Sequence, residues 1–109
     1  MHSDAKLVAR IDRLAEAFGV ERRMMFGGAA WFCGGHFVTG VWHDKLVLRL
    51  GPDAAEKAMG RDHVVPMDIT GRPMRGWVMV EPLGVNTAAK LRRWIGHAKS
   101  FNDTLDPKA

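Results

Sequence analysis

The cysteine and three of the histidines raise the question of a metal site: Cys33, His36, His43 and His63. Cys33 and His36 would face each other across a two-residue turn, which makes them the one pair able to share a ligand. His36 and His43 are seven residues apart on one expected strand, so they point to opposite faces about 23 Å apart. Because a structural zinc site needs four ligands, we expect no metal. A small ligand or metal ion near Cys33 and His36 is the alternative interpretation.

Two glycine pairs, Gly27-Gly28 and Gly34-Gly35, raise the question of phosphate binding. A phosphate loop places its glycines between a strand and a helix, and the P-loop also ends in Gly-Lys followed by Ser or Thr. Gly27-Gly28 leads into an expected strand, and Gly34-Gly35 joins two expected strands with no lysine nearby. The pairs therefore predict hairpin turns and close approach of the backbone, and we expect no cofactor.

The sequence offers few groups for covalent catalysis. Cys33 lies in an apolar run without a cationic helix end beside it, which is typical of a small buried hydrophobic residue. The serines, Ser3 and Ser100, lie at the ends of expected helices. Three acidic residues lie in separate turns and strands: Asp44, Asp68 and Glu81. The sequence therefore predicts a protein without enzymatic activity.

The composition indicates one globular domain over residues 1–109. Apolar residues make up 47% and charged residues 26% of the chain, which is enough material for one core. No apolar run reaches the roughly 18 residues of a membrane span, and the N-terminus lacks the hydrophobic block of a signal peptide. The single cysteine agrees with a reducing compartment, and we expect a cytoplasmic protein that does not enter a membrane.

The net charge of +4 raises the question of an acidic partner. Most basic residues are scattered along the sequence, as is typical of a solvated face. The expected last helix carries three of them close together: Lys90, Arg92 and Arg93. Weak DNA binding through this helix is therefore an alternative function.

Apolar periodicity predicts an α+β domain in which helices pack on an antiparallel sheet of about five strands. The expected order is a helix, three strands, a helix, two strands and a helix. Ser3 would cap the first helix, Gly19 would end it, and Asn86 would cap the last helix. Pro66 would place its strand at a sheet edge, and the C-terminal tail would fray. The expected helices span 4–18, 52–59 and 87–101, with Gly60 ending the second, and the expected strands lie within 29–33, 36–43, 45–50, 63–69 and 76–82.

Turns at Gly34-Gly35 and at His43-Asp44 would fix the pairing of the central strands. Ala30 would then face Thr39, and Phe32 would face Phe37. One face of the sheet would collect a core surface of Ala30, Phe32, Phe37, Thr39, Val41, Leu46, Leu48 and Leu50. The opposite face would hold an apolar set that either another segment of the chain or a partner must cover, and we interpret it as a candidate partner surface, for example in a homodimer: Trp31, Val38, Trp42 and Val47.

Two short motifs lie at turns of this expected fold: Met25-Phe26-Gly27-Gly28 before the first strand, and Gly71-Arg72-Pro73-Met74 between the last two. With these motifs the chain resembles the N-terminal domain of the TfoX/Sxy family, bacterial proteins linked to the regulation of natural competence. The resemblance covers about Leu7 to Phe101. It implies an α+β fold akin to secretion-chaperone-like domains, no known catalysis, and a role in binding or transcriptional regulation.

Full-length competence regulators also carry a C-terminal helical domain, and this chain ends before one could begin. We therefore expect a stand-alone accessory protein that binds an unknown protein partner. Arg72 has two open interpretations, because its planar guanidinium could clamp a carboxylate within the fold or be presented to that partner.

Overall fold

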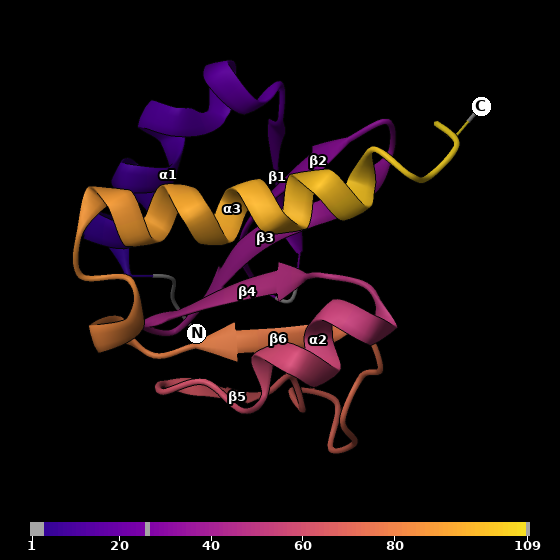
Figure 1. Cartoon of the computed structure of the whole chain (residues 1–109). Helices are drawn as coiled ribbons and strands as arrows, with labels where there is room; N and C mark the ends of the chain where they lie inside the picture. Colours follow the sequence, from indigo (N-terminus) through magenta and orange to yellow (C-terminus); the bar gives the residue numbers. More distant parts are fainter. Residues whose placement is uncertain (1–3, 26, 109) are drawn as a thin grey trace.

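The computed structural model describes residues 4–25 and 27–108, which form a six-stranded antiparallel sheet with α-helices packed on it (Figure 1). The α+β class is confirmed, with six strands in place of about five. The strand order across the sheet is β1-β2-β3-β4-β6-β5. The strands are β1 (Glu21–Met25), β2 (Gly28–Cys33), β3 (His36–Trp42), β4 (Lys45–Arg49), β5 (Val64–Pro66) and β6 (Trp77–Val80). The helices are α1 (Ala5–Phe18), α2 (Pro52–Ala58), the short 3-10 helix η1 (Pro82–Gly84) and α3 (Ala88–Asn102).

The additional strand is β1. Its sequence, ERRMM, does not alternate between apolar and polar residues, and four of its five residues are exposed. Its backbone pairs with β2, from Glu21 opposite Phe32 to Met25 opposite Gly28. An ion pair of 2.6 Å between Arg22 and Asp12 also ties it to α1. This strand is held by backbone pairing at a sheet edge, and side-chain periodicity therefore could not predict it.

The helix ends follow the predicted capping chemistry with small shifts in position. Ser3 lies outside the described residues, and Asp4 caps α1 by accepting hydrogen bonds from the N–H groups of Lys6 and Leu7. Gly19 ends α1 with a φ of +67°, as predicted. Thr87, one residue after the predicted Asn86, caps α3. Both caps use a short oxygen-bearing side chain to satisfy free N–H groups.

The Gly34-Gly35 turn is confirmed, with φ angles of +62° and +82°, and Cys33 pairs with His36 as expected. The register then shifts, because Phe32 pairs with Phe37 but Trp31 pairs with Thr39. Val38 is therefore an extra residue in β3, which is the definition of a β-bulge. Ala30 pairs with Gly40 and not with Thr39, so the register prediction was wrong beyond the bulge.

Because of the bulge, the side chains of β2 lie on the side of the sheet opposite to the predicted one. Trp31 packs in the core beneath the helices, whereas three residues of the expected core surface lie on the other side of the sheet: Ala30, Phe32 and Phe37. The proposed partner surface was consequently wrong. Trp31 and Val38 have no exposed surface, Val47 is 2% exposed, and only Trp42 of that set is half-buried.

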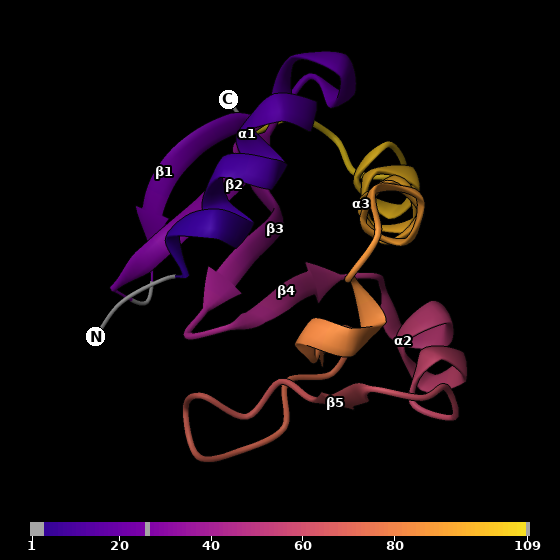
Figure 2. The same cartoon turned by 90° about the vertical axis from the view of Figure 1, so that its left-hand side faces the viewer.

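All three α-helices lie on one side of the curved sheet (Figure 2). The face beneath them, called the helix face here, is buried and includes Trp31, Leu46, Leu48, Val78 and Val80, which pack with Ile11 of α1 and with Leu91 and Ile95 of α3. The opposite face, called the second face, has a smaller buried cluster of Ala30, Phe37, Val47, Met67 and Met79. Half-buried apolar side chains surround that cluster: Met25, Phe32, Trp42, Val65, Ile69, Met74 and Trp77.

The segment that covers the second face is residues 67–76, the connection between β5 and β6, which extends to the side away from the helices (Figure 2). Pro66 ends the edge strand β5, as predicted. The C-terminal tail does not fray. Its Lys108 N–H donates to the Gly34 carbonyl at 2.8 Å, and the Asp106 carbonyl lies 2.8 Å from His36 Nε2. The tail therefore packs on the β2–β3 hairpin.

Candidate functional site

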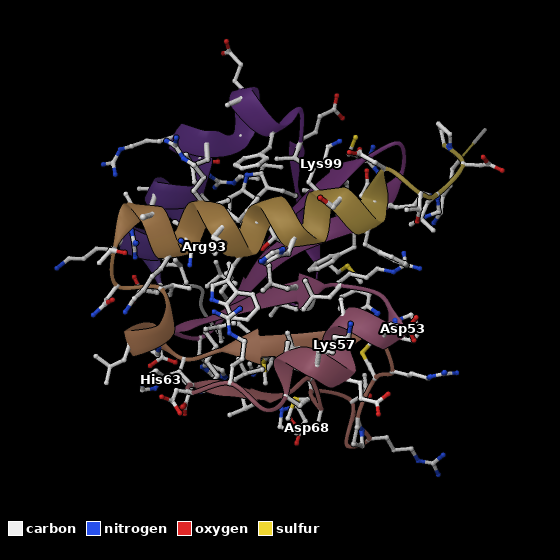
Figure 3. The ribbon with its side chains drawn as sticks, in the orientation of Figure 1. Asp53, Lys57, His63, Asp68, Arg93 and Lys99 are labelled. Carbon is white, nitrogen blue, oxygen red and sulfur yellow. The ribbon has the colours of Figure 1, made fainter. Side chains whose placement is uncertain are left out.

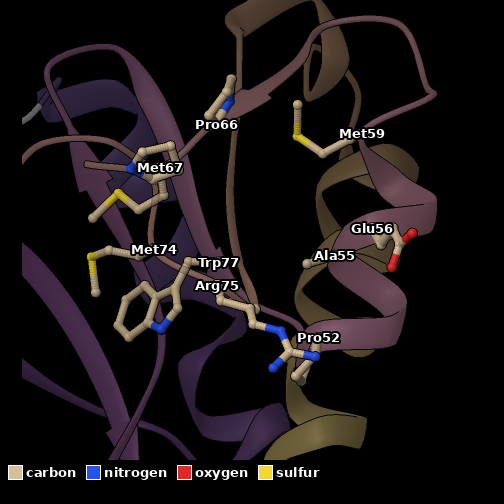
Figure 4. Close-up of a pocket in the computed structure, with 11 residues that line it drawn as sticks. Pro52, Ala55, Glu56, Met59, Pro66, Met67, Met74, Arg75 and Trp77 are labelled. Carbon is tan, nitrogen blue, oxygen red and sulfur yellow. The ribbon is translucent and has the colours of Figure 1, made fainter. Parts of the chain in front are cut away.

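A pocket of about 350 Å³ lies between α2 and the 67–76 connection (Figure 4). We call it the methionine pocket, because Met67, Met74 and Trp77 form one wall, and Ala55 of α2 and Met59, the residue after this helix, lie opposite. Its lining is mainly apolar and also includes three prolines: Pro52, Pro66 and Pro73. Met67 is fully buried, while Met59 is 40% exposed. The pocket is therefore an open extension of the second face.

Backbone hydrogen bonds hold the 67–76 connection in a closed loop. Met74 N–H donates to the Met67 carbonyl at 2.9 Å, and Trp77 N–H donates to the Met74 carbonyl at 3.1 Å. The Gly76 carbonyl accepts from the N–H of Leu50 at 2.8 Å, which joins the loop to the start of α2. Gly71 adopts a φ of +89° at the tip, a conformation that glycine reaches without steric cost. The loop thus places Met74 in the pocket wall.

The first three residues of the motif Gly71-Arg72-Pro73-Met74 therefore lie at the exposed tip of the loop, and the fourth lies in the pocket wall. Gly71, Arg72 and Pro73 are exposed, and Met74 is half-buried. Among the described residues, the four ion pairs do not include Arg72. Its carbonyl accepts a hydrogen bond from the Thr70 hydroxyl at 3.4 Å. The interpretation of Arg72 as an internal clamp thus lacks a carboxylate, and its presentation at the surface agrees with the geometry.

The first motif contributes to the same side of the sheet. Met25 packs against the second face, and Gly27 lies in the β1–β2 turn with a φ of +74°. Phe26 lies outside the described residues. Gly28 starts β2 and pairs with Met25, so no helix follows this glycine pair and the geometry of a phosphate loop is not present there. Both motifs thus place a methionine, Met25 or Met74, on the second face.

Cys33 and His36 are neighbours across the hairpin, and both are half-buried. The Cys33 carbonyl accepts from Asn102 Nδ2 at 3.1 Å, and His36 contacts the tail. Within residues 4–25 and 27–108, no group of three or more His, Cys, Asp or Glu side chains is arranged to hold a metal ion. This corner of the molecule joins the hairpin, α3 and the tail.

Three basic residues in the first half of α3, Lys90, Arg92 and Arg93, are exposed. Lys90 and Arg93 line a second hollow of about 510 Å³, whereas Arg92 is not part of its lining. The same hollow is lined by Arg61 and His63 from the α2–β5 connection. We call it the basic hollow. Sequence reasoning missed Arg61 and considered His63 only as a possible metal ligand, because the two residues are brought to α3 only by the packing of α2 and β5.

A family model described as the TfoX N-terminal domain matches residues 12–101 of this chain. Searches of the curated proteins and of the solved structures give no match, so the likeness to secretion chaperones stays a prediction. Among the described residues, no helix has both the length and the apolar character needed to cross a membrane.

Proposed function

Since the chain belongs to the TfoX N-terminal domain family, we propose that it is a regulatory module without enzymatic activity that acts by binding another protein. Family membership associates the chain with regulation at a general level. The finer part of the proposal, binding through the methionine pocket, rests on the shape and the chemistry of that pocket. Transcriptional regulation is the process that the family relationship favours.

The observation that carries this proposal is an open apolar pocket at a family motif. Met59, Met67 and Met74 give the pocket flexible, polarisable walls, and such walls adapt to side chains of different shapes. Trp77 adds a rigid aromatic surface, which is half-buried. Aromatic residues and methionine are enriched in protein interfaces relative to the rest of a surface. The pocket thus suits one or two apolar side chains of a partner.

The charged residues around the methionine pocket indicate which residues of the partner lie next to its apolar side chains. Arg75 lines the pocket and is exposed, and Arg72 is exposed in the same loop. Among the described residues, neither arginine takes part in an ion pair. Glu56 of α2 is the acidic residue in the pocket lining. Complementary charge steers association and selects partners. We therefore propose a partner segment with an apolar anchor followed by acidic residues.

A homodimer through the originally expected surface conflicts with burial, because Trp31, Val38 and Val47 are inside the fold. A second copy could still occupy the methionine pocket, and light scattering distinguishes this outcome from a different partner. DNA binding by Lys90, Arg92 and Arg93 stays a prediction. It has less support, because only two of these three residues, Lys90 and Arg93, line the basic hollow.

The test compares two substitutions of exposed methionines. Met59→Asp places a charge in the pocket, whereas Met24→Asp places the same charge on β1, where Met24 is 71% exposed. A protein captured from native extract, then purified, should bind the wild type and Met24→Asp equally. Its binding to Met59→Asp should weaken by about tenfold or more, as for the loss of an interface anchor.

Reversal of the charge on the lining residue Arg75, by Arg75→Glu, should weaken the same complex and should reduce its dependence on salt. Circular dichroism confirms that each variant is folded. If every captured protein binds Met59→Asp as tightly as the wild type, the methionine pocket is not the binding site and the proposal fails.

A further inference from the structure

We propose that the basic hollow binds the phosphate group of a small phosphorylated molecule. This inference does not depend on the methionine pocket, since the two sites share no lining residue. The hollow lies where three segments meet: the connection from Gly60 to His63 after α2, Gly84 at the end of η1, and the first half of α3. His63 and Arg93 mark two of these segments in Figure 3.

The first step of the argument is the convergence of basic groups. Lys90 and Arg93 are three residues apart on α3, which places their side chains on one side of the helix. Arg61 and His63 approach from the connection between α2 and β5. Four side chains that can donate hydrogen bonds thus line one hollow from two separate parts of the sequence.

The second step concerns the orientation of Arg61. Its guanidinium lies 4.5 Å from the centre of the Trp94 ring, and Trp94 is only 5% exposed. A buried ring is a fixed support, and stacking on it restricts the guanidinium before any ligand arrives. The N–H groups at the edge of the guanidinium are still available. Arg61 is therefore already ordered to bind an oxyanion.

The third step concerns charge. Three cations, Arg61, Lys90 and Arg93, line the hollow together with one carboxylate, Asp62. Among the described residues, none of these four takes part in an ion pair. The Lys90 ammonium donates one hydrogen bond, of 3.1 Å, to Asn86, which leaves further donors. The lining has an excess of two positive charges, and a phosphate monoester carries a charge of about −1.5 to −2 at neutral pH.

The fourth step concerns shape. His63 has a φ of +68°, an uncommon conformation for a residue other than glycine, and such backbone strain concentrates at functional sites. Its carbonyl accepts a hydrogen bond of 2.8 Å from Glu81 N–H. A Cβ at Gly84 would overlap Val80 and would lie 3.1 Å from the His63 Cβ, so glycine permits this close approach. At about 510 Å³ the hollow exceeds a lone phosphate and has room for a small ester.

The test is a titration with inorganic phosphate and with pyrophosphate at low salt, followed by NMR of the amide groups. Arg61→Gln and Arg93→Gln should each weaken binding by about tenfold, because each removes a charged hydrogen bond. Arg92→Gln is the matched control, since it removes the same charge from the same helix outside the hollow. It should leave the dissociation constant within about twofold.

Three outcomes would overturn the proposal. The first is no shift of the amide signals of residues 60–63 at phosphate concentrations up to about 10 mM. The second is equal weakening by Arg92→Gln and Arg93→Gln, which would indicate general charge attraction. The third is binding of duplex DNA that depends equally on Lys90, Arg92 and Arg93 without phosphate binding, which would assign these residues to nucleic acid. All variants are first checked for an unchanged melting temperature.

Discussion

The two faces of the sheet carry similar apolar side chains but are covered in different ways. The helix face packs against α1, α2 and α3, and its central residues, such as Leu46, Leu48 and Val78, have no exposed surface. The second face is covered by the 67–76 connection, and Phe32, Trp42 and Trp77 on it are half-buried. Methionines are found mainly on this side of the sheet: Met25, Met67, Met74 and Met79.

This difference indicates a division of roles between the faces. A surface sealed by helices contributes stability in proportion to the apolar area that it removes from water. A surface covered by one loop retains accessible apolar area, and such area in a folded protein marks a site of interaction. The two short motifs singled out in the sequence contribute Met25 and Met74 to the second face, which agrees with the proposed role of that face in binding.

The largest expected effect comes from a tryptophan on each face. Trp31→Ala should lower the free energy of unfolding by about 3–5 kcal/mol, because it leaves a large cavity in the core. Trp31 is fully buried, and its indole N–H donates to Asp12 at 3.1 Å. Trp42→Ala, on the second face, should cost about 1–2 kcal/mol, because the side chain is already partly in water. Urea unfolding measures both values.

Equal losses for Trp31→Ala and Trp42→Ala would break the comparison between the faces. They would indicate that the second face contributes as much to stability as the helix face does. In that case the half-buried side chains would be structural, and the binding role of the methionine pocket would lose its basis.

The next largest effect concerns Met67, the fully buried residue of the methionine pocket. Met67→Ala should lower the free energy of unfolding by about 2–3 kcal/mol through the cavity that it creates. It should also increase hydrogen exchange of the 67–76 connection, since Met67 anchors that loop. Met74→Ala is the control, and it should cost about 1 kcal/mol because Met74 is half-buried. A larger loss for Met74→Ala would reverse this assignment of the anchor.

The smallest expected effect concerns the ion pair between Lys99 and Asp103 at the C-terminal end of α3. The hydrogen bond from Lys99 to Asp103 raises the pKa of Lys99 above its usual value of 10.5, while partial burial opposes the shift. A raised pKa in the folded state stabilises the protein fully below the unfolded value. This contribution is lost as the pH rises through the folded value.

Asp103→Asn should therefore reduce stability by a few tenths of a kcal/mol at neutral pH, as for an exposed helix pair. The difference from the wild type should become smaller as the pH rises through the raised pKa of Lys99. Urea unfolding at neutral pH and at about pH 11 measures it, a range set by the usual lysine pKa. A difference that stays constant across this range would show that Asp103 acts through helix packing and not through the charge of Lys99.

Local chemistry was the most predictable part of the fold. Gly34-Gly35 and Gly19 adopt positive φ angles where the sequence predicts turns and a helix end, because glycine alone reaches them freely. Pro52 starts α2, and Pro66 lies on an edge strand, as expected from the missing N–H group of proline. The motif Gly71-Arg72-Pro73-Met74 was singled out correctly as a turn, but the pocket beside it was not foreseen.

The sequence by itself determined the three α-helices, five of the six strands and the turns between the central strands, since each depends on neighbours within a few residues. Tertiary structure decided which face of the sheet each side chain occupies. The bulge at Val38 in β3 shifts the pairing with β2, so the residues of β2 lie on the opposite faces from those expected. Tertiary structure also brought Arg61 and His63 to Lys90 and Arg93. These arrangements depend on how distant segments pack together, and no local pattern of residue types encodes that packing.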